Sequence, residues 1–322
     1  MFEEILPDLY RIEIPLPRNP LQSLNSYLIK GDGRFLIIDT GLNRDECRDA
    51  MLSALEELHV DLASTSFFIT HIHADHSGLL TTLASENSIV YFNQKESVMI
   101  DSGGLWEGFN MFFLSHGFPE EELAKAMDSH PGRRYGLKRH FDFTVVNEGD
   151  PIEIGDYCFK CVSTPGHSPG HMSLYEANKN ILIAGDHILF DITPNIGFWP
   201  NMEDALTQYL ASLEKVYQLD VSIVLPGHRN ILNDHKTRIK ELQEHHHDRL
   251  NEIISALEGG EKTAYELAPC ISWDVDFGSW ELFPPAQKWF AFGETLAHAK
   301  HLEKKEMIQS KHRGDKIVFS LK

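Results

Sequence analysis

Three histidines and an aspartate lie within the six residues of HIHADH, residues 71–76, directly after the apolar run FFIT. Imidazole nitrogens and carboxylate oxygens are ligands for borderline divalent metals such as zinc. His71 and His73 are two residues apart on an extended segment, so both side chains leave the same side of the chain. Asp75 and His76 fall where the chain is expected to turn into a helix. This spacing predicts a metal site at a strand end.

Three later segments also end an apolar strand with a side chain that can bind a metal. His167 follows the strand in STPGHSPGH, Asp186 ends LIAGD, and His228 ends IVLPGH. If these strands share one edge, seven ligands meet there, which is enough for two metals. The expected distribution gives three side chains to each metal and one bridging carboxylate: His71, His73 and His167; Asp75, His76 and His228; Asp186.

Strands that alternate with helices are needed to position these side chains. Residues 9–40 indicate short strands, with the hairpin signal GDG between two apolar runs. Helical periodicity follows in residues 40–60, strands resume over 143–185, and residues 203–219 form a further helix before SIVLPGH. The mixed order predicts an α/β layered fold.

Residues 94–140 are expected to form a helical insertion over one face. The insertion is rich in aromatic residues, and Trp106 and Phe113 are candidates for lining a substrate pocket, with Phe198 and Trp199 forming the opposite rim. The alternative is that these rings form the packing core of the insertion. The basic stretch 131–140 either holds an anionic part of a substrate or is a solvated turn.

The net charge of −19 disfavours a nucleic-acid partner, because phosphate binding needs a basic surface. The charge is uneven: residues 235–322 hold 13 basic and 14 acidic residues, so the first 234 residues are strongly acidic. The tail is predicted to contain three helices and a hairpin, an order that resembles a winged helix. The aromatic stretch 273–290 either closes over the site or forms a subunit contact, so a homodimer stays open.

No apolar run approaches the roughly 20 residues of a membrane span, and acidic residues stand where a signal peptide would have basic ones. We therefore expect a cytoplasmic protein with no membrane partner. Four cysteines show no paired framework and are expected to be reduced thiols.

The motifs HxHxDH, GHSPGH, GD and PGH, in this order, resemble the metallo-β-lactamase-fold superfamily across roughly residues 9–234. The tail resembles that of a subset of these hydrolases, the group that includes β-lactamase-like protein 2. The resemblance implies a four-layer αβ/βα sandwich with two metals at its mouth, held by the seven side chains named above. It therefore implies a catalytic domain over 1–234 and a winged-helix-like domain over 235–322. It also matches Asp39, in LIIDTG, to an aspartate that orients a ligand imidazole.

The expected activity is hydrolysis of a small-molecule ester or thioester, as in glyoxalase II-like members. Two divalent metals, zinc or alternatively iron or manganese, would share a hydroxide that attacks the carbonyl carbon. Asp75 would orient this hydroxide and carry a proton to the leaving group. The acidic body and apolar insertion favour a small-molecule substrate. A lactonase, a single-strand ribonuclease and a non-catalytic metal-binding protein stay open as alternatives.

Overall fold

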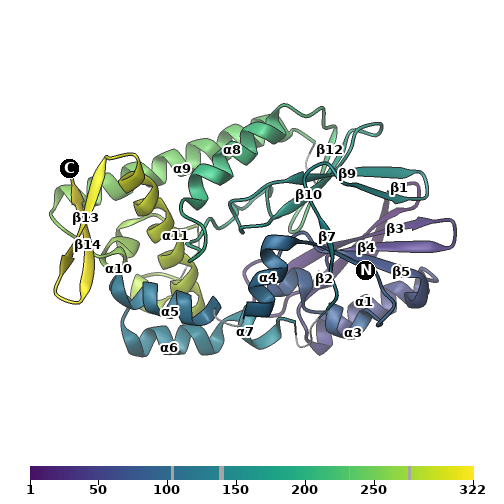
Figure 1. Cartoon of the computed structure of the whole chain (residues 1–322), viewed down its shortest axis with the longest axis horizontal. Coiled ribbons are helices and arrows are strands. Elements are labelled where there is room, and N and C mark those ends of the chain that lie inside the picture. The colour runs from purple at the N-terminus through teal and green to yellow at the C-terminus, as the bar shows by residue number, and fades with distance from the viewer. Residues whose placement is uncertain (103–104, 138–140, 232, 275–276) are drawn as a thin grey trace.

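Two mixed β-sheets face one another in the computed structural model, which describes residues 1–102, 105–137, 141–231, 233–274 and 277–322 (Figure 1). The first sheet has seven strands in chain order, antiparallel from β1 to β4 and parallel from β4 to β7. Its strands are β1 (Phe2–Leu6), β2 (Leu9–Pro15), β3 (Ser23–Gly31), β4 (Arg34–Ile38), β5 (Thr65–Phe68), β6 (Val90–Asn93) and β7 (Thr144–Val146).

The second sheet has five strands in the order β12-β11-β10-β9-β8. Its pairs are antiparallel except for β11 and β12, which run parallel. The strands are β8 (Pro151–Ile154), β9 (Tyr157–Ser163), β10 (Met172–Glu176), β11 (Ile181–Gly185) and β12 (Ile223–Pro226). Because β11 and β12 are parallel, the residues that follow them emerge at the same edge of the sheet.

An apolar core fills the space between the two sheets. Tyr27 and Phe68 from the first sheet pack in one cluster with Phe159 and Leu174 from the second, and all four are buried. Strand β9 alternates buried and exposed side chains over most of its length, as a strand with one solvated face should. These inner faces hold the two sheets together, with the loops that carry the candidate ligands at one end.

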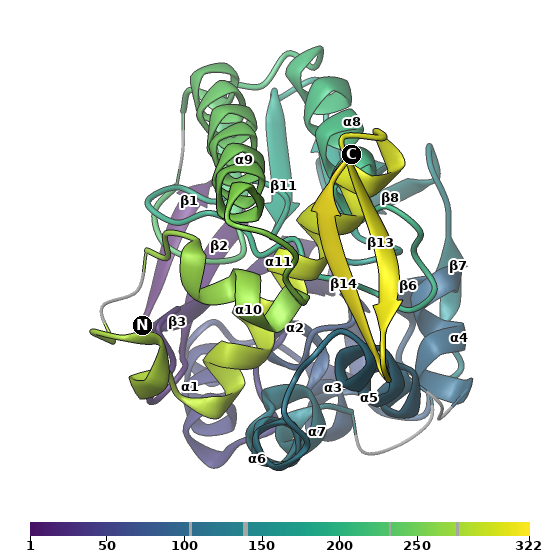
Figure 2. The same ribbon diagram turned by 90° about the vertical axis from the view of Figure 1, so that its left-hand side faces the viewer.

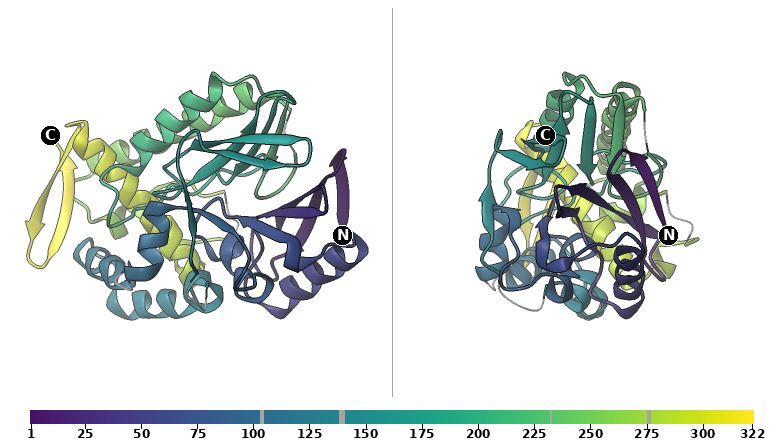
Figure 3. Two further views of the ribbon diagram at one scale, coloured as in Figure 1. Left: turned by 45° about the vertical axis from the view of Figure 1, so that its right-hand side comes forward. Right: turned by 90° about the vertical axis from the view of Figure 1, so that its right-hand side faces the viewer.

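Helices cover both outer faces of the sandwich and complete four layers (Figure 3). On the first sheet lie α1 (Asp45–Glu57), α2 (Ala74–Ser77) and α3 (Leu80–Leu83), with the short turn η1 (Leu62–Ser64) nearby. The second sheet is covered by α8 (Ala205–Tyr217), whose Leu206 and Leu213 share a cluster with Leu182 of β11. The predicted layered αβ/βα sandwich is confirmed.

The insertion and the tail pack against each other beside the sandwich (Figure 2). The insertion contains α4 (Gln94–Ser102), α5 (Leu105–Ser115), α6 (Glu120–Ser129) and α7 (Pro131–Tyr135). The tail contains α9 (His235–Glu258), α10 (Ala264–Leu267), the turns η2 (Ala268–Cys270) and η3 (Trp280–Leu282), α11 (Pro285–Lys304) and the hairpin of β13 (Ile308–Arg313) and β14 (Lys316–Leu321). Most side chains of α11 are buried, and this helix packs against α6 of the insertion and α9 of the tail.

Two smaller expectations concern membrane spans and cysteines. No helix in the described part of the chain is both long enough and apolar enough to cross a membrane. The four cysteines are unpaired, and Cys158 and Cys161 lie on β9 with one exposed and the other buried. These two thiols therefore do not share a site.

Candidate metal centre

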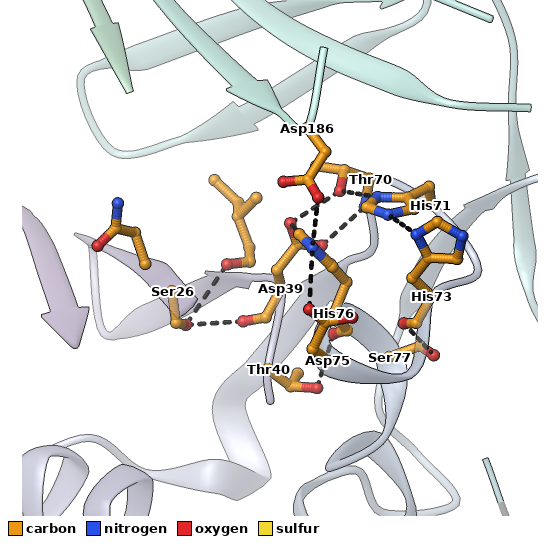
Figure 4. Close-up of polar contacts among 12 residues, drawn as sticks. Ser26, Asp39, Thr40, Thr70, His71, His73, Asp75, His76, Ser77 and Asp186 are labelled. Atoms are coloured by element: carbon orange, nitrogen blue, oxygen red, sulfur yellow. Dashed lines mark hydrogen bonds and ion pairs between the residues drawn. The ribbon is translucent and has the colours of Figure 1, made fainter. Parts of the chain in front are cut away.

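The HIHADH segment leaves β5 and turns directly into α2. His71 Nε2 lies 2.9 Å from His73 Nδ1, so the two rings converge as their spacing predicted (Figure 4). The His73 carbonyl accepts the backbone N–H of His76 and the Ser77 hydroxyl, the latter at 3.0 Å. This tight turn brings Asp75 and His76 to the same end of the sandwich as the first two histidines.

Side chains from the second sheet close this cluster. His167, in the loop between β9 and β10, places its Nε2 3.2 Å from His71 Nε2 and 2.9 Å from His73 Nδ1. His228 follows β12 and places its Nε2 3.4 Å from Asp75 Oδ2. Three segments that are far apart in the sequence therefore meet in one cluster.

Asp186 lies between the two halves of the cluster. Its Oδ2 is 3.4 Å from His76 Nε2, 3.4 Å from His228 Nε2 and 3.6 Å from His167 Nε2. The ligand atoms form three overlapping sets that are each compact enough to hold an ion: His71, His73 and His167; His71, His76 and Asp186; Asp75, His76 and His228. Two of these sets have the members that the sequence analysis expected for the two metals, and Asp186 joins His71 and His76 in the third.

The first histidine set fits a cation because the lone pairs of its ring nitrogens point toward one another. Thr70 Oγ1 donates to Asp39 Oδ2 at 2.8 Å and therefore accepts from His71 Nδ1, 3.0 Å away. His167 Nδ1 donates to the Asn195 carbonyl at 2.8 Å. The two Nε2 atoms therefore carry no proton, yet they lie 3.2 Å apart. Two facing lone pairs repel, and a divalent metal between them would remove the repulsion.

The second set is fixed at Nδ1 in the same way, but its Nε2 atoms face carboxylates. His76 Nδ1 lies 2.7 Å from Asp39 Oδ2, and His228 Nδ1 donates to the Ser23 carbonyl at 2.7 Å. Their buried Nε2 atoms form no hydrogen bond among the described residues, but each lies 3.4 Å from Asp186 Oδ2. Without a metal, the carboxylates favour a proton on these Nε2 atoms, and a divalent metal would take the place of that proton because both rings are already fixed at Nδ1.

The charges of the cluster suit a dication. Burial lowers the pKa of His73 to about 3, with His167 acting in the same direction, so this imidazole is neutral at pH 7. Burial opposes the charged form of His228, but Asp186 and Asp75 outweigh it and raise its pKa to about 10. The carboxyl of Asp186 is also buried, yet His228 and His76 hold its pKa well below the usual range. The carboxylates therefore stay ionised and can neutralise bound metal.

Asp39, which the resemblance matches to an orienting aspartate, lies behind two of the candidate ligands. It is 2% exposed and accepts the Thr70 N–H at 2.9 Å, the Thr70 hydroxyl at 2.8 Å and His76 Nδ1 at 2.7 Å. Asp39 thus fixes the His76 ring directly and the His71 ring through Thr70.

Two contributors to the site lacked any signal in the sequence. Glu96, at the start of α4, is fully buried and accepts from the Ser168 hydroxyl and from the Gly170 N–H, the latter at 2.8 Å, so it holds the loop of His167. Asn195 supplies the carbonyl that fixes His167. Both residue types are common on surfaces, and both partners are distant in sequence.

The four candidate substrate contacts occupy different places. The Trp199 ring stacks 5.7 Å from the His73 ring, and its Nε1 donates to the His167 carbonyl at 3.1 Å. Trp106 and Phe198 are half-buried. Phe113 is 0% exposed, because the rings of Trp289 and Phe292 pack against it. The structure therefore places Trp199 beside the ligands and Phe113 in the packing core.

Comparisons with known proteins agree with this geometry. The model of the Metallo-beta-lactamase superfamily matches residues 20–228. The "Probable metallo-hydrolase YqjP" of Bacillus subtilis is 25% identical over 97% of both chains. A "Beta-lactamase-like protein 2 homolog" of Caenorhabditis elegans is 26% identical over 75% of this chain and 68% of its own, which confirms the resemblance to β-lactamase-like protein 2.

Two further likenesses concern structure and activity. A solved metallo-beta-lactamase family protein from Thermus thermophilus is 29% identical, with a TM-score of 0.84 over 99% of this chain and 100% of that chain. The "Acyl-coenzyme A thioesterase MBLAC2" of Gallus gallus is 27% identical over 64% of this chain and 73% of its own. The Thermus likeness covers the insertion and the tail as well as the sandwich.

Proposed function

This chain belongs to the metallo-beta-lactamase superfamily and is a metallo-hydrolase, and from this premise we propose that it cleaves a small-molecule thioester or ester with two divalent metals. The observation that carries the proposal is the position of Asp186, whose Oδ2 lies within 3.6 Å of histidines from both halves of the cluster. A cluster of this form suits two neighbouring ions, with zinc as the first choice and iron or manganese as alternatives.

The metals and the chain would divide the chemistry between them. When bound, two divalent ions activate a water molecule and polarise the carbonyl of the substrate. His71, His73 and His167 would hold one ion, and Asp75, His76 and His228 the other.

Asp75 is the carboxylate of the cluster that is best placed for proton transfer. Its side chain is 15% exposed, against 7% for Asp186 and 3% for Asp39. We assign to it the orientation of the attacking water and the delivery of a proton to the leaving group.

Aromatic side chains beside the cluster support an apolar substrate group. Trp199 stacks on His73 and contacts Phe109, and Trp106 contacts Phe109 in turn. This series of rings leads from a ligand histidine into the insertion; Trp199 and Phe109 are buried and Trp106 is half-buried, so an acyl group would contact the exposed part of Trp106. The named activity of the Gallus gallus relative, an acyl-coenzyme A thioesterase, supports the thioester over other esters.

We also propose a division into two domains, a cellular location and a class of partner. The order α9, α10, α11, β13, β14 supports a winged-helix-like unit over 235–322 that follows a catalytic unit over 1–234. The unpaired cysteines support a cytoplasmic location. A small-molecule substrate is proposed as the partner, with a homodimer as an open alternative and without nucleic acid or membrane.

The test combines metal content with substrate cleavage in the wild type, His73→Ala, Asp186→Ala and the matched surface variant His247→Ala. About two metals per chain and metal-dependent hydrolysis of a generic thioester are expected in the wild type and in His247→Ala. Both site variants should lose metal and activity together. Cleavage of a short RNA without cleavage of the thioester would refute the proposed substrate class, and wild-type protein that binds no metal would refute the whole proposal.

A further inference from the structure

The loop after β11 is attached to helix α11 of the tail. Asn195, in this loop, accepts His167 Nδ1 at its carbonyl and donates its side-chain Nδ2 to Glu294 Oε2 at 2.6 Å. Farther along the same loop, the Phe198 N–H donates to the Gly293 carbonyl at 2.9 Å. The residue that orients a candidate ligand is thus itself held by the tail.

Glu294 is paired with an arginine on α9. Arg249 Nη1 donates to Glu294 Oε1 at 2.6 Å, and its Nη2 donates to the Ser272 carbonyl at 2.8 Å. Both charged side chains are 6% exposed, and the guanidinium lies 4.4 Å over the Trp273 ring. A buried ion pair is weak evidence for stability alone, because desolvation offsets most of its attraction. A role in positioning accounts for it better.

The side chains around Glu294 are less suited to binding a metal ion than to positioning the Asn195 loop. His245, His246 and Glu294 are close enough to share an ion. However, both oxygens of Glu294 are already engaged, and a cation there would face the positive charge of Arg249. His246 Nδ1 is also within 3.0 Å of His298 Nε2.

We propose that Glu294, fixed by Arg249, is a positioning residue that acts through Asn195 to hold His167 in its metal-binding tautomer. This inference rests on the proposed dinuclear site and makes the tail a working part of that site. With Nδ1–H bound to a fixed carbonyl, the Nε2 lone pair of His167 faces the other ligands. Groups that orient a ligand histidine in this way typically change metal affinity by about 10- to 100-fold when they are removed.

The experiment measures metal dissociation constants by chelator competition on the full chain, together with melting of the metal-free protein. The variants are Glu294→Gln and Asn195→Ala. The matched control is Glu122→Gln, because Glu122 accepts Lys288 Nζ at 2.6 Å, also on α11, and its side-chain partners among the described residues are Lys288 and Tyr265 rather than a candidate ligand. Asn195→Ala leaves the buried ion pair in place, so it serves even if Glu294→Gln folds poorly.

We expect both test variants to bind one of the two metal equivalents at least tenfold more weakly, with altered visible absorption of the cobalt-substituted protein. The control should keep wild-type affinity and spectrum, even where its melting temperature falls. Affinities within twofold of wild type for both test variants, with changes in melting alone, would overturn the inference. These readouts need no substrate, so failure to cleave a thioester would count against the proposed function only.

Discussion

Replacement of Asp39 by asparagine isolates the effect of one orienting carboxylate on metal binding. Asp39 adopts a left-handed backbone conformation, with φ of 58°, which asparagine tolerates better than most residues. Asn is also nearly the same size, so the change replaces one acceptor oxygen with an amide donor and removes the charge. In the wild type, three groups lie within hydrogen-bond distance of this carboxylate: Thr70 N–H, the Thr70 hydroxyl and His76 Nδ1.

The magnitude follows from what His76 must do to bind metal. Its Nε2 must carry the lone pair, so its Nδ1 must carry the proton. In Asp39→Asn, an amide that still accepts from the Thr70 N–H presents its own N–H groups to His76 Nδ1. Two donors then face each other in the metal-bound state, and a buried donor without a partner costs about 1–3 kcal/mol. Since every 1.4 kcal/mol is a factor of ten, affinity should fall by roughly 5- to 150-fold.

Chelator competition on the purified variant measures this loss, and Asp204→Asn is a close control. Asp204 is also buried and accepts the Thr207 N–H, the Thr207 hydroxyl and His301 Nδ1, but it lies away from the candidate ligands. The control should lose stability without losing metal affinity. Wild-type affinity in Asp39→Asn, or an equal loss of affinity in Asp204→Asn, would refute the reasoning.

Three further predictions concern stability and substrate contact. Burial raises the pKa of Glu96 from 4.5 to about 7, so the folded state favours the neutral carboxyl. This contribution to stability is fully present below about pH 4.5. As the pH rises to 7, the free energy of unfolding should fall by about 3 kcal/mol. In Glu96→Gln, the free energy of unfolding measured in denaturant should depend less on pH over this window. An unchanged pH dependence would contradict the buried position of Glu96. Trp199→Ala should raise KM for the thioester and also lower metal affinity, because its ring stacks on His73 and its Nε1 donates to the His167 carbonyl; an unaltered KM together with an unaltered metal content would exclude Trp199 as a contact of the site. Phe113→Ala should lower the free energy of unfolding by about 3–5 kcal/mol and leave metal affinity within twofold, whereas a loss below about 1 kcal/mol would contradict its core position.

The ligand set could be predicted from the sequence because its signal is local. Each candidate ligand follows an apolar strand, and strand ends of a layered fold meet at one edge. The contacts behind the ligands could not be predicted, because Asn195 and Glu294 are ordinary polar residues whose meeting depends on how the tail docks. Aromatic density alone also failed to separate Phe113, which is fully buried, from Trp199, which lies beside His73. Pocket walls and packing cores use the same residue types.

The attachment of the Asn195 loop to α11 has a consequence for the order in which the site matures during synthesis. His228 completes the ligand set, but Glu294 leaves the ribosome roughly 3–13 s later at about 5–20 residues per second. During this interval the nascent chain presents every ligand without the contact that holds Asn195 in place. Metal loading is therefore expected to become tight only after translation has passed α11, so a newly made chain acquires its cofactors as a late step.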